Sequence, residues 1–308
     1  MSDRALDVPM KLLLAITNDD LASAATAVAL ALQHERNARP SVAYVIEIGP
    51  AVPEAAMLVA QLGDPRTLAR EAVGMRPVLH IDQGAAASWP FEVTVGSVAQ
   101  EVVETAQRQE VDLIVMGLSR HGTVGRAIGN DTVREVMTIG GVPVLAVRPE
   151  LTALPKRVVI AVDFSRASIR AAQLVRRLVD DDCSVHLLFV ESDSPRETTE
   201  SAEGLQLIRS HGVDDAFAEL IRTLDAPPGM TIDANVRQGK PVAEITRFCE
   251  EIAPDLVAVG SQHHRFLDRL LLGSVGKAIA GDGRWSVLVT PPGMVEHTAP
   301  IEVSAARR

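Results

Sequence analysis

A glycine-containing stretch near the end of the chain has the residue types and spacing of an anion-binding loop. Gly260 follows an apolar run of strand length, and Gly273-Ser274 opens a helical pattern 273 − 260 = 13 positions later. The first turn of a helix presents unpaired backbone N–H groups, which bind phosphate oxygens, and glycine lets an anion approach the backbone closely. The stretch therefore indicates a site for a phosphorylated ligand.

Two adjacent histidines, His263 and His264, lie in the same loop and raise the alternative of a metal site. Adjacent histidines rarely converge on one ion, and no cysteine or carboxylate stands near them at a standard ligand spacing. His186 and Asp268 are remote partners only. We therefore expect solvated histidines and no bound metal.

Other catalytic and phosphate-binding motifs are excluded by their spacing. A Walker loop needs glycine where the chain has Leu271 and Ser or Thr where it has Ala278. The dinucleotide fingerprint G-x-G-x-x-G is absent after the first strand, and so is the nucleophile elbow G-x-S-x-G. Asp163 also follows an apolar run, but no nucleophile or paired acid is placed with it. We expect Asp163 to position a ligand and the protein not to be an enzyme.

The segments that carry these motifs occur twice in the chain. Val111–Gly117 is repeated as Pro254–Gly260 at an offset of 260 − 117 = 143, and Lys11–Ile16 is repeated as Arg157–Val162 at 157 − 11 = 146. Each copy has the size of a typical domain. We predict domains at residues 1–150 and 151–292, followed by a flexible tail at residues 293–308.

Apolar runs of strand length alternate with amphipathic helical patterns in both copies. This alternation predicts an α/β protein with two tandem, open, doubly wound parallel sheets of five strands each. The predicted strands are Leu12–Ile16, Val42–Ile48, Phe91–Val95, Leu113–Met116, Val142–Val147, Arg157–Asp163, Ser184–Val190, Thr231–Arg237, Leu256–Val259 and Ser286–Thr290. The predicted helices of the second copy are Ser165–Asp181, with Ser165 as N-cap, Leu205–Leu224, irregular near Gly212, and Val242–Glu251.

Composition excludes several other classes of function. The 308 residues carry 30 basic and 40 acidic side chains, a net charge of −10, and only 3% aromatic residues, so nucleic acid is an unfavourable partner. The two cysteines, Cys183 and Cys249, are too far apart for a CxxC redox or zinc site. No apolar stretch reaches membrane-spanning length. We expect a cytoplasmic protein without a membrane partner.

With these motifs in this order, nearly the whole chain resembles the universal stress protein family, in tandem. The family signature of Gly, two residues, Gly, nine residues, Gly and Ser or Thr keeps its spacing here, with His263 in place of the second glycine. Three further segments resemble the family sequence: Val162-Asp163-Phe164-Ser165, Gly239-Lys240-Pro241 and Leu270–Val275. The resemblance implies the adenine nucleotide alpha hydrolase-like or flavodoxin-like fold.

The resemblance also implies an adenine nucleotide, ATP or a relative, in the second copy. Asp163 would lie beside the adenosine, and Gly273 and Ser274 would face the phosphates. The full set that the resemblance implies is Ala161, Asp163, Val259, Gly260, Gln262, His263, Gly273, Ser274 and Val275. The implied function is a non-enzymatic stress-response protein. His263 keeps open an interaction module that binds no nucleotide, and a slow ATP hydrolase is the third alternative.

The first copy departs further from the family signature. Thr17 stands where the second copy has Asp163, and Asn130 stands where it has Ser274. Its loop from Gly117 to Gly129 spans 129 − 117 = 12 positions against 13. We expect this nucleotide site to be degenerate, with an anion pocket at Arg120 and Arg126 as the alternative.

The last strand of each copy predicts how the copies associate. Members of the family commonly dimerise through this strand, and an exposed sheet edge favours strand pairing. We expect the strands at residues 142–147 and 286–290 to pair within the chain and form an internal pseudo-dimer. A homodimer of such chains is also compatible with the sequence, and other protein partners are not indicated.

Overall fold

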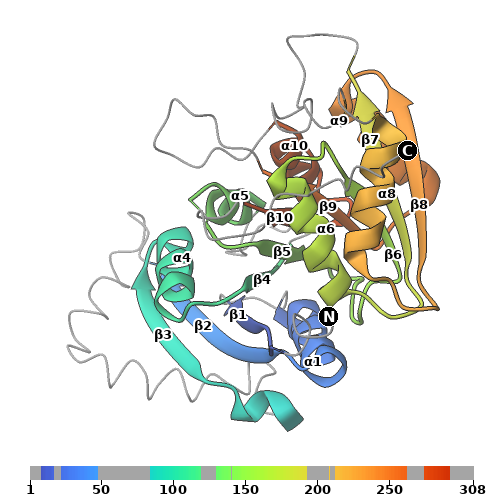
Figure 1. Ribbon diagram of the computed structural model, residues 1–308. Helices are drawn as coiled ribbons and strands as arrows, with labels where there is room; N and C mark the ends of the chain where they lie inside the picture. The colour runs from blue at the N-terminus through green and yellow to red at the C-terminus, as the bar shows by residue number, and fades with distance from the viewer. Residues whose placement is uncertain are drawn as a thin grey trace, which may run out of the picture.

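The computed structural model describes residues 8–16, 22–47, 84–118, 130–139, 141–192, 208, 212–261 and 274–291. In this part of the chain, the strands form one ten-stranded sheet in the order β3-β2-β1-β4-β5-β10-β9-β6-β7-β8 (Figure 1). The first copy supplies one half of the sheet and the second copy supplies the other. Each half therefore repeats the same order, with its first strand in the centre and its last strand at the middle of the whole sheet.

The elements of the two halves correspond one to one for most of their length. In the first half they are β1 (Lys11–Ile16), α1 (Ala22–Arg36), β2 (Arg39–Glu47), the 3-10 helix η1 (Gly84–Ser88), β3 (Phe91–Gly96), α4 (Val98–Arg108), β4 (Leu113–Gly117), α5 (Asn130–Ile139) and β5 (Val144–Val147). In the second half they are β6 (Arg157–Ala161), α6 (Arg166–Leu178), β7 (Ser184–Glu191), α8 (Val213–Leu224), β8 (Thr231–Gln238), α9 (Pro241–Ile252), β9 (Leu256–Gly260), α10 (Ser274–Asp282) and β10 (Ser286–Thr290).

Helices cover both faces of this sheet, as apolar central strands require. Side chains alternate along each strand, so that Leu12 and Leu14 of β1 enter one core and Leu13 and Ala15 enter the other. The first core lies under α1, α6 and α8, and the second lies under α4, α5, α9 and α10. Each core contains residues of both halves, so the two halves share their packing.

The halves join at their last strands. β5 and β10 pair antiparallel, with Leu145 opposite Leu288 and Val144 opposite Val289. Because Leu288 is the repeat equivalent of Leu145 (145 + 143 = 288), each strand meets its own counterpart, as in a two-fold dimer interface. We call this pairing the strand seam. It confirms the predicted pseudo-dimer within one chain.

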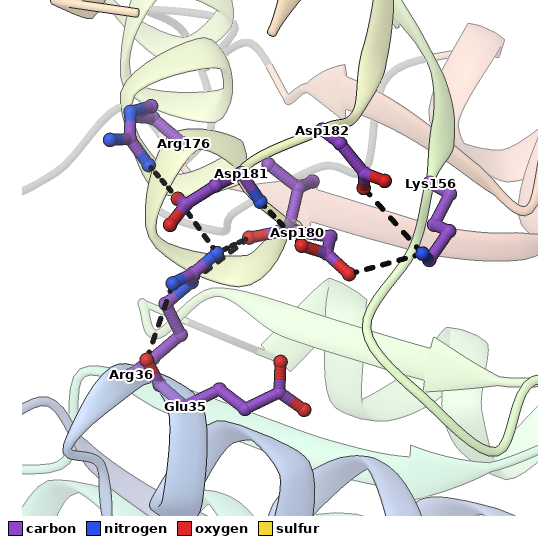
Figure 2. Close-up of polar contacts among 8 residues, drawn as sticks. Glu35, Arg36, Lys156, Arg176, Asp180, Asp181 and Asp182 are labelled. Atoms are coloured by element: carbon purple, nitrogen blue, oxygen red, sulfur yellow. Dashed lines mark hydrogen bonds and ion pairs between the residues drawn. The ribbon is translucent and has the colours of Figure 1, made fainter. Parts of the chain in front are cut away.

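A second contact between the halves lies at the ends of α1 and α6, and we call it the helix seam (Figure 2). Arg36, the last residue of α1, donates from Nε to the Val179 carbonyl at 2.9 Å and from Nη2 to Asp181 Oδ1 at 3.0 Å. Val179 is the C-cap residue of α6, whose terminal carbonyls have no partner within the helix. An arginine of the first half thus caps a helix of the second half.

The opposite face of the sheet has a similar contact. Arg148, directly after β5, donates from Nη1 to the Gly283 carbonyl at 2.6 Å, and its N–H donates to Ser286 Oγ at 3.1 Å. Gly283 follows α10 and has φ = 68°, the left-handed geometry that ends helices. On both faces, therefore, arginines of the first half bind carbonyls at helix ends of the second.

The predicted strands and helices agree with the structure apart from their ends. β10 has the predicted bounds, and Ser165 is the N-cap of α6, its Oγ accepting from the Ser168 N–H. The predicted strand Arg157–Asp163 is too long, because β6 ends at Ala161. Of the predicted helix Leu205–Leu224, the structure describes α8, which begins at Val213 after Gly212, where φ is 87°. Residues 205–207 and 209–211 lie outside the described residues. The predicted tail, residues 293–308, lies outside the described residues.

Candidate functional site

The strand order of the second half reverses between β6 and β9. The chain leaves β6 for β7 on one side, whereas β9 lies on the other side, with Ala161 opposite Val259. In open α/β sheets this reversal opens a crevice at the carboxyl ends of the strands. The structure therefore brings Asp163, two residues beyond β6, and Gly260, the last residue of β9, to the same edge.

Hydroxyl groups hold Asp163 in the turn that leads into α6. Its Oδ1 accepts from the Ser165 N–H at 3.0 Å and from the Ser165 hydroxyl at 2.5 Å. The Asp163 N–H lies 3.4 Å from Ser168 Oγ, which itself donates to the Ser165 carbonyl at 3.1 Å. This network accounts for the end of the strand near Ala161, because Asp163, Ser165 and Ser168 form a hydrogen-bonded turn there.

Phe164 has a left-handed backbone at the centre of this turn, with φ = 55°. A bulky residue rarely adopts that conformation, so packing must hold it there. The Phe164 ring is buried against Phe217, with centroids 5.2 Å apart, and against Phe189, at 5.6 Å. These aromatic contacts anchor the turn from the core, while the Asp163 carboxylate stays half-buried at the sheet edge.

Gly260 has a structural role that the sequence did not reveal. A Cβ atom at this position would lie 2.6 Å from the carbonyl carbon of Ala167, and closer still to the Ser168 nitrogen. Both are backbone atoms in the first turn of α6, so they cannot move aside cheaply. The first glycine of the signature thus lets α6 pack closely against the end of β9. This packing requires glycine at position 260 whether or not an anion approaches the backbone there.

Three apolar residues of the implied set lie on the opposite side of β6 and β9 from α6. Val259 is part of the core under α10, and Ala161 and Val275 pack against the same core. α10 begins at Ser274 and packs on β9 and β10. The start of a helix has N–H groups without partners inside the helix and the positive end of its dipole, the features that favour an anion.

Three residues of the implied set are not among the described residues. Gln262, His263 and Gly273 lie outside the described residues, as do His264 and Asp268. His186 is on β7, with Nδ1 3.6 Å from Asp233 Oδ2 and its ring edge-on to Phe248. Over the described ranges, no three His, Cys, Asp or Glu side chains gather in a way that could hold a metal ion.

The corresponding corner of the first half is only partly described. β4 ends at Gly117 and α5 begins at Asn130, just as β9 ends at Gly260 and α10 begins at Ser274. The connections span 130 − 117 = 13 and 274 − 260 = 14 positions, so the first-half loop is one residue shorter, as the aligned glycines indicated. Thr17, Arg120 and Arg126 lie outside the described residues.

Sequence reasoning missed Ser168, whose hydroxyl and N–H close the turn around Asp163. The available signal was a second serine three residues after the N-cap residue Ser165. A hydroxyl at that position can bond back to the cap, which favours a helix start held by side chains.

Two open, doubly wound parallel halves are joined through their last strands into one sheet. This architecture defines the protein as a tandem α/β protein. The model of the universal stress protein family matches residues 10–148 and again residues 155–291. The chain therefore belongs to the universal stress protein family and contains two copies of its domain.

Individual relatives agree with this assignment. A universal stress protein of Methanocaldococcus jannaschii is 27% identical over 139 residues, covering 44% of this chain and 82% of that protein. The crystal structure of a universal stress protein from Archaeoglobus fulgidus matches with a TM-score of 0.59 and 17% identity, over 92% of this chain and 98% of that one. A structure described as a putative universal stress protein of Pseudomonas aeruginosa matches with a TM-score of 0.57 and 14% identity, over 93% of this chain and 95% of that one. At these identities the two structures establish the fold alone.

None of the described helices is both long enough and apolar enough to cross a membrane.

Proposed function

We propose that this protein is a non-enzymatic stress-response protein that binds ATP or a related adenine nucleotide in its second domain. One observation supports the proposal: the strand order reverses between β6 and β9, which brings Asp163 and Gly260 to the same edge of the sheet. α10 follows β9 in the chain, begins at Ser274 and packs on β9 and β10. The Asp163 carboxylate is held in place by Ser165 and suits a ribose or base donor. The first N–H groups of α10 suit phosphate oxygens.

The first domain provides a matched control, because Asn130 begins α5 as Ser274 begins α10. Isothermal titration of the full chain with ATP is expected to detect binding at millimolar ligand or below. Ser274→Ala and Asp163→Asn are each expected to weaken it roughly tenfold, since a hydrogen bond to a charged group contributes about 1.5–3 kcal/mol. Asn130→Ala is expected to leave it unchanged.

Asp163→Asn is preferred to alanine because asparagine keeps the acceptor oxygen that Ser165 requires. An absence of heat with millimolar ATP, or equal weakening by Ser274→Ala and Asn130→Ala, would contradict nucleotide binding in the second domain. Release of phosphate from ATP that depends on Asp163 or Ser274 would instead make the protein a hydrolase.

A further inference from the structure

A cavity of about 400 Å³ lies where the first half meets α6. Asp112 and Pro143, which precede β4 and β5, form its first-half wall, and α6, the end of α8 and Thr290 of β10 form the other walls. None of its described lining residues belongs to the implied nucleotide set, although Thr290 lies opposite Gly260 in the sheet. Its volume is sufficient for a small organic ligand.

Three arginines of α6 give this cavity an excess of positive charge. Arg170, Arg176 and Arg177 line it, against the carboxylates of Asp112 and Asp225, so the described lining has a formal charge of 3 − 2 = +1. Arg170 is half-buried, and no described residue forms a hydrogen bond or an ion pair with it. A half-buried guanidinium has five donors, and without a partner among the described residues it favours an anionic ligand.

The other two arginines are positioned by the junction between the halves. Arg177 Nη2 donates to the Val8 carbonyl of the first half at 2.9 Å. Arg176 Nη1 lies 3.7 Å from Asp181 Oδ1, the atom that also accepts from Arg36 (Figure 2). Residues of both halves therefore fix the orientation of the cationic wall.

Two buried polar atoms of the lining have no hydrogen-bond partner within the described part of the chain. They are Arg176 Nε and Thr290 Oγ1. Thr290 is 1% exposed, and its side chain lies on the same side of β10 as Leu288, which faces α1 and α6. An unpaired buried polar group costs about 1–3 kcal/mol, so two in one cavity indicate that an acceptor-rich molecule can satisfy them.

We propose that this cavity binds a small organic anion through its carboxylate or phosphate oxygens. Arg170 and Arg176 supply the guanidinium groups, and Thr290 supplies a neutral hydroxyl. Arginine forms paired, charge-assisted hydrogen bonds with either kind of oxyanion. The ligand would contact Arg176, and through Asp181 it would be coupled to Arg36 and to the helix seam.

The test is a calorimetric titration of the full-length protein with citrate as the carboxylate probe and pyrophosphate as the phosphate probe. At least one probe is expected to bind at millimolar concentration or below, and the better one identifies the class of anion. Arg170→Gln is expected to weaken that binding by roughly tenfold or more, and Arg170→Lys is expected to weaken it less. Arg247→Gln, the same change of charge on the exposed side of α9, is the matched control.

One further variant distinguishes this site from the proposed nucleotide site. Ser274→Ala is expected to leave probe binding unchanged, whether or not the protein binds ATP. Binding that Ser274→Ala abolishes, that Arg247→Gln weakens as much as Arg170→Gln, or that neither probe produces would overturn the cavity proposal. Melting curves of each unliganded variant identify any loss of binding that follows from misfolding.

Thr290→Val distinguishes a ligand-binding hydroxyl from a structural one. Because Oγ1 has no partner without a ligand, the unliganded variant is expected to melt at the same temperature as the parent or higher. The rise in melting temperature on adding the better probe is expected to shrink. A lower melting temperature of the unliganded variant would show that the hydroxyl is structural and would remove it from the site.

Discussion

The strand seam and the helix seam join the same two domains in different ways. The strand seam is symmetrical, with Val144, Leu145 and Ala146 facing Val289, Leu288 and Val287. The helix seam is not. Arg36 donates to the end of α6, and it lies between β1 and β2, where the repeat offset changes from 157 − 11 = 146 to 184 − 39 = 145. At either offset its counterpart in the second domain is acidic, Asp182 or Asp181. The symmetrical seam suits any two copies of the domain, whereas the charged seam suits only a first domain paired with a second.

The contact on the other face leads to the same conclusion. The repeat equivalent of Arg148 is Pro291 (148 + 143 = 291), which has neither a charged side chain nor an N–H to donate. We therefore expect strand pairing and apolar burial to supply most of the stability of the junction, and the arginines to decide which two domains pair. Substitutions in each seam can separate these two contributions.

The largest effect is expected from the strand seam. Leu145→Ala and Leu288→Ala each truncate a fully buried side chain and are expected to lower the free energy of unfolding by about 2–5 kcal/mol. Symmetry predicts similar losses for the two. Denaturant titration measures both losses. The control is Val236→Ala at an exposed position of β8, which is expected to change the free energy of unfolding by less than about 0.5 kcal/mol. A large difference between the two leucines would show that the seam is not energetically symmetrical.

Buried thiols report whether the domains open together. Burial raises the pKa of Cys183, and of Cys249, to about 12, so neither thiol of the second domain reacts appreciably at neutral pH while folded. Leu145→Ala, a change in the first domain, is expected to speed the labelling of both by a thiol reagent, because the cores are shared. An unchanged labelling rate would mean that the domains open independently.

A smaller effect is expected from the helix seam. Arg36→Met removes the cap of α6 while keeping much of the apolar stem, and is expected to cost about 1–3 kcal/mol. Asp181→Asn is expected to cost less than about 1 kcal/mol, because the Asp181 side chain is 62% exposed and its ion pair is screened. The reverse order in denaturant titration would show that the ion pair, and not the helix cap, is the main contribution.

The smallest effect is a pH dependence at the edge of the helix seam. Burial alone would raise the pKa of Asp180, but the Asp181 N–H and Lys156 outweigh it, so the pKa lies below its ordinary value of 3.8. A lowered pKa stabilises the fold above the ordinary value, and this stabilisation is lost as the pH falls through the lowered pKa. Asp180→Asn is therefore expected to melt slightly lower than the parent at neutral pH, with the difference shrinking below about pH 4.

Lys156 should show the matching behaviour at alkaline pH. Its hydrogen bond with Asp180, and then the charge of Asp182, raise the pKa of Lys156 above 10.5. This contribution is complete below the ordinary value and is lost as the pH rises through the raised one. In Lys156→Met, this loss of stability at alkaline pH is expected to disappear from the profile of melting temperature against pH. If the variant still loses stability over the same pH range, another group is responsible.

Most of the fold could be predicted from the sequence because its cause is local and periodic. The apolar runs of β1 and β9 and their repetition at a fixed offset indicate buried parallel strands, and the last strand of each copy indicates the strand seam. The end of β6 could not be predicted, because the run Arg157–Asp163 continues past Ala161 in hydrophobicity. The strand ends close to the hydrogen bond between Asp163 and Ser165, and the hydrophobicity of the sequence does not indicate where that bond forms.

The candidate site also contains features that could be predicted from the sequence and features that could not. Asp163 and Ser274 follow from motif spacing, but the close approach of α6 that requires Gly260 depends on how a helix packs over a strand distant in sequence. The cap that Arg36 provides depends on two helix ends meeting across the junction. Contacts of this kind arise only after the domains have assembled, so one copy of the repeat contains no sign of them.

The position of β5 at the middle of the sheet has a consequence for synthesis on the ribosome. The first domain is complete once Val147 has emerged, but the strand that covers its edge ends at Thr290, 290 − 147 = 143 residues later. At roughly 5–20 residues per second, the nascent chain presents an apolar strand edge for about 7–30 seconds. During that interval two neighbouring nascent chains on one messenger could pair through β5, and the charged contacts of Arg36 and Arg148 would favour exchange to the chain's own second domain.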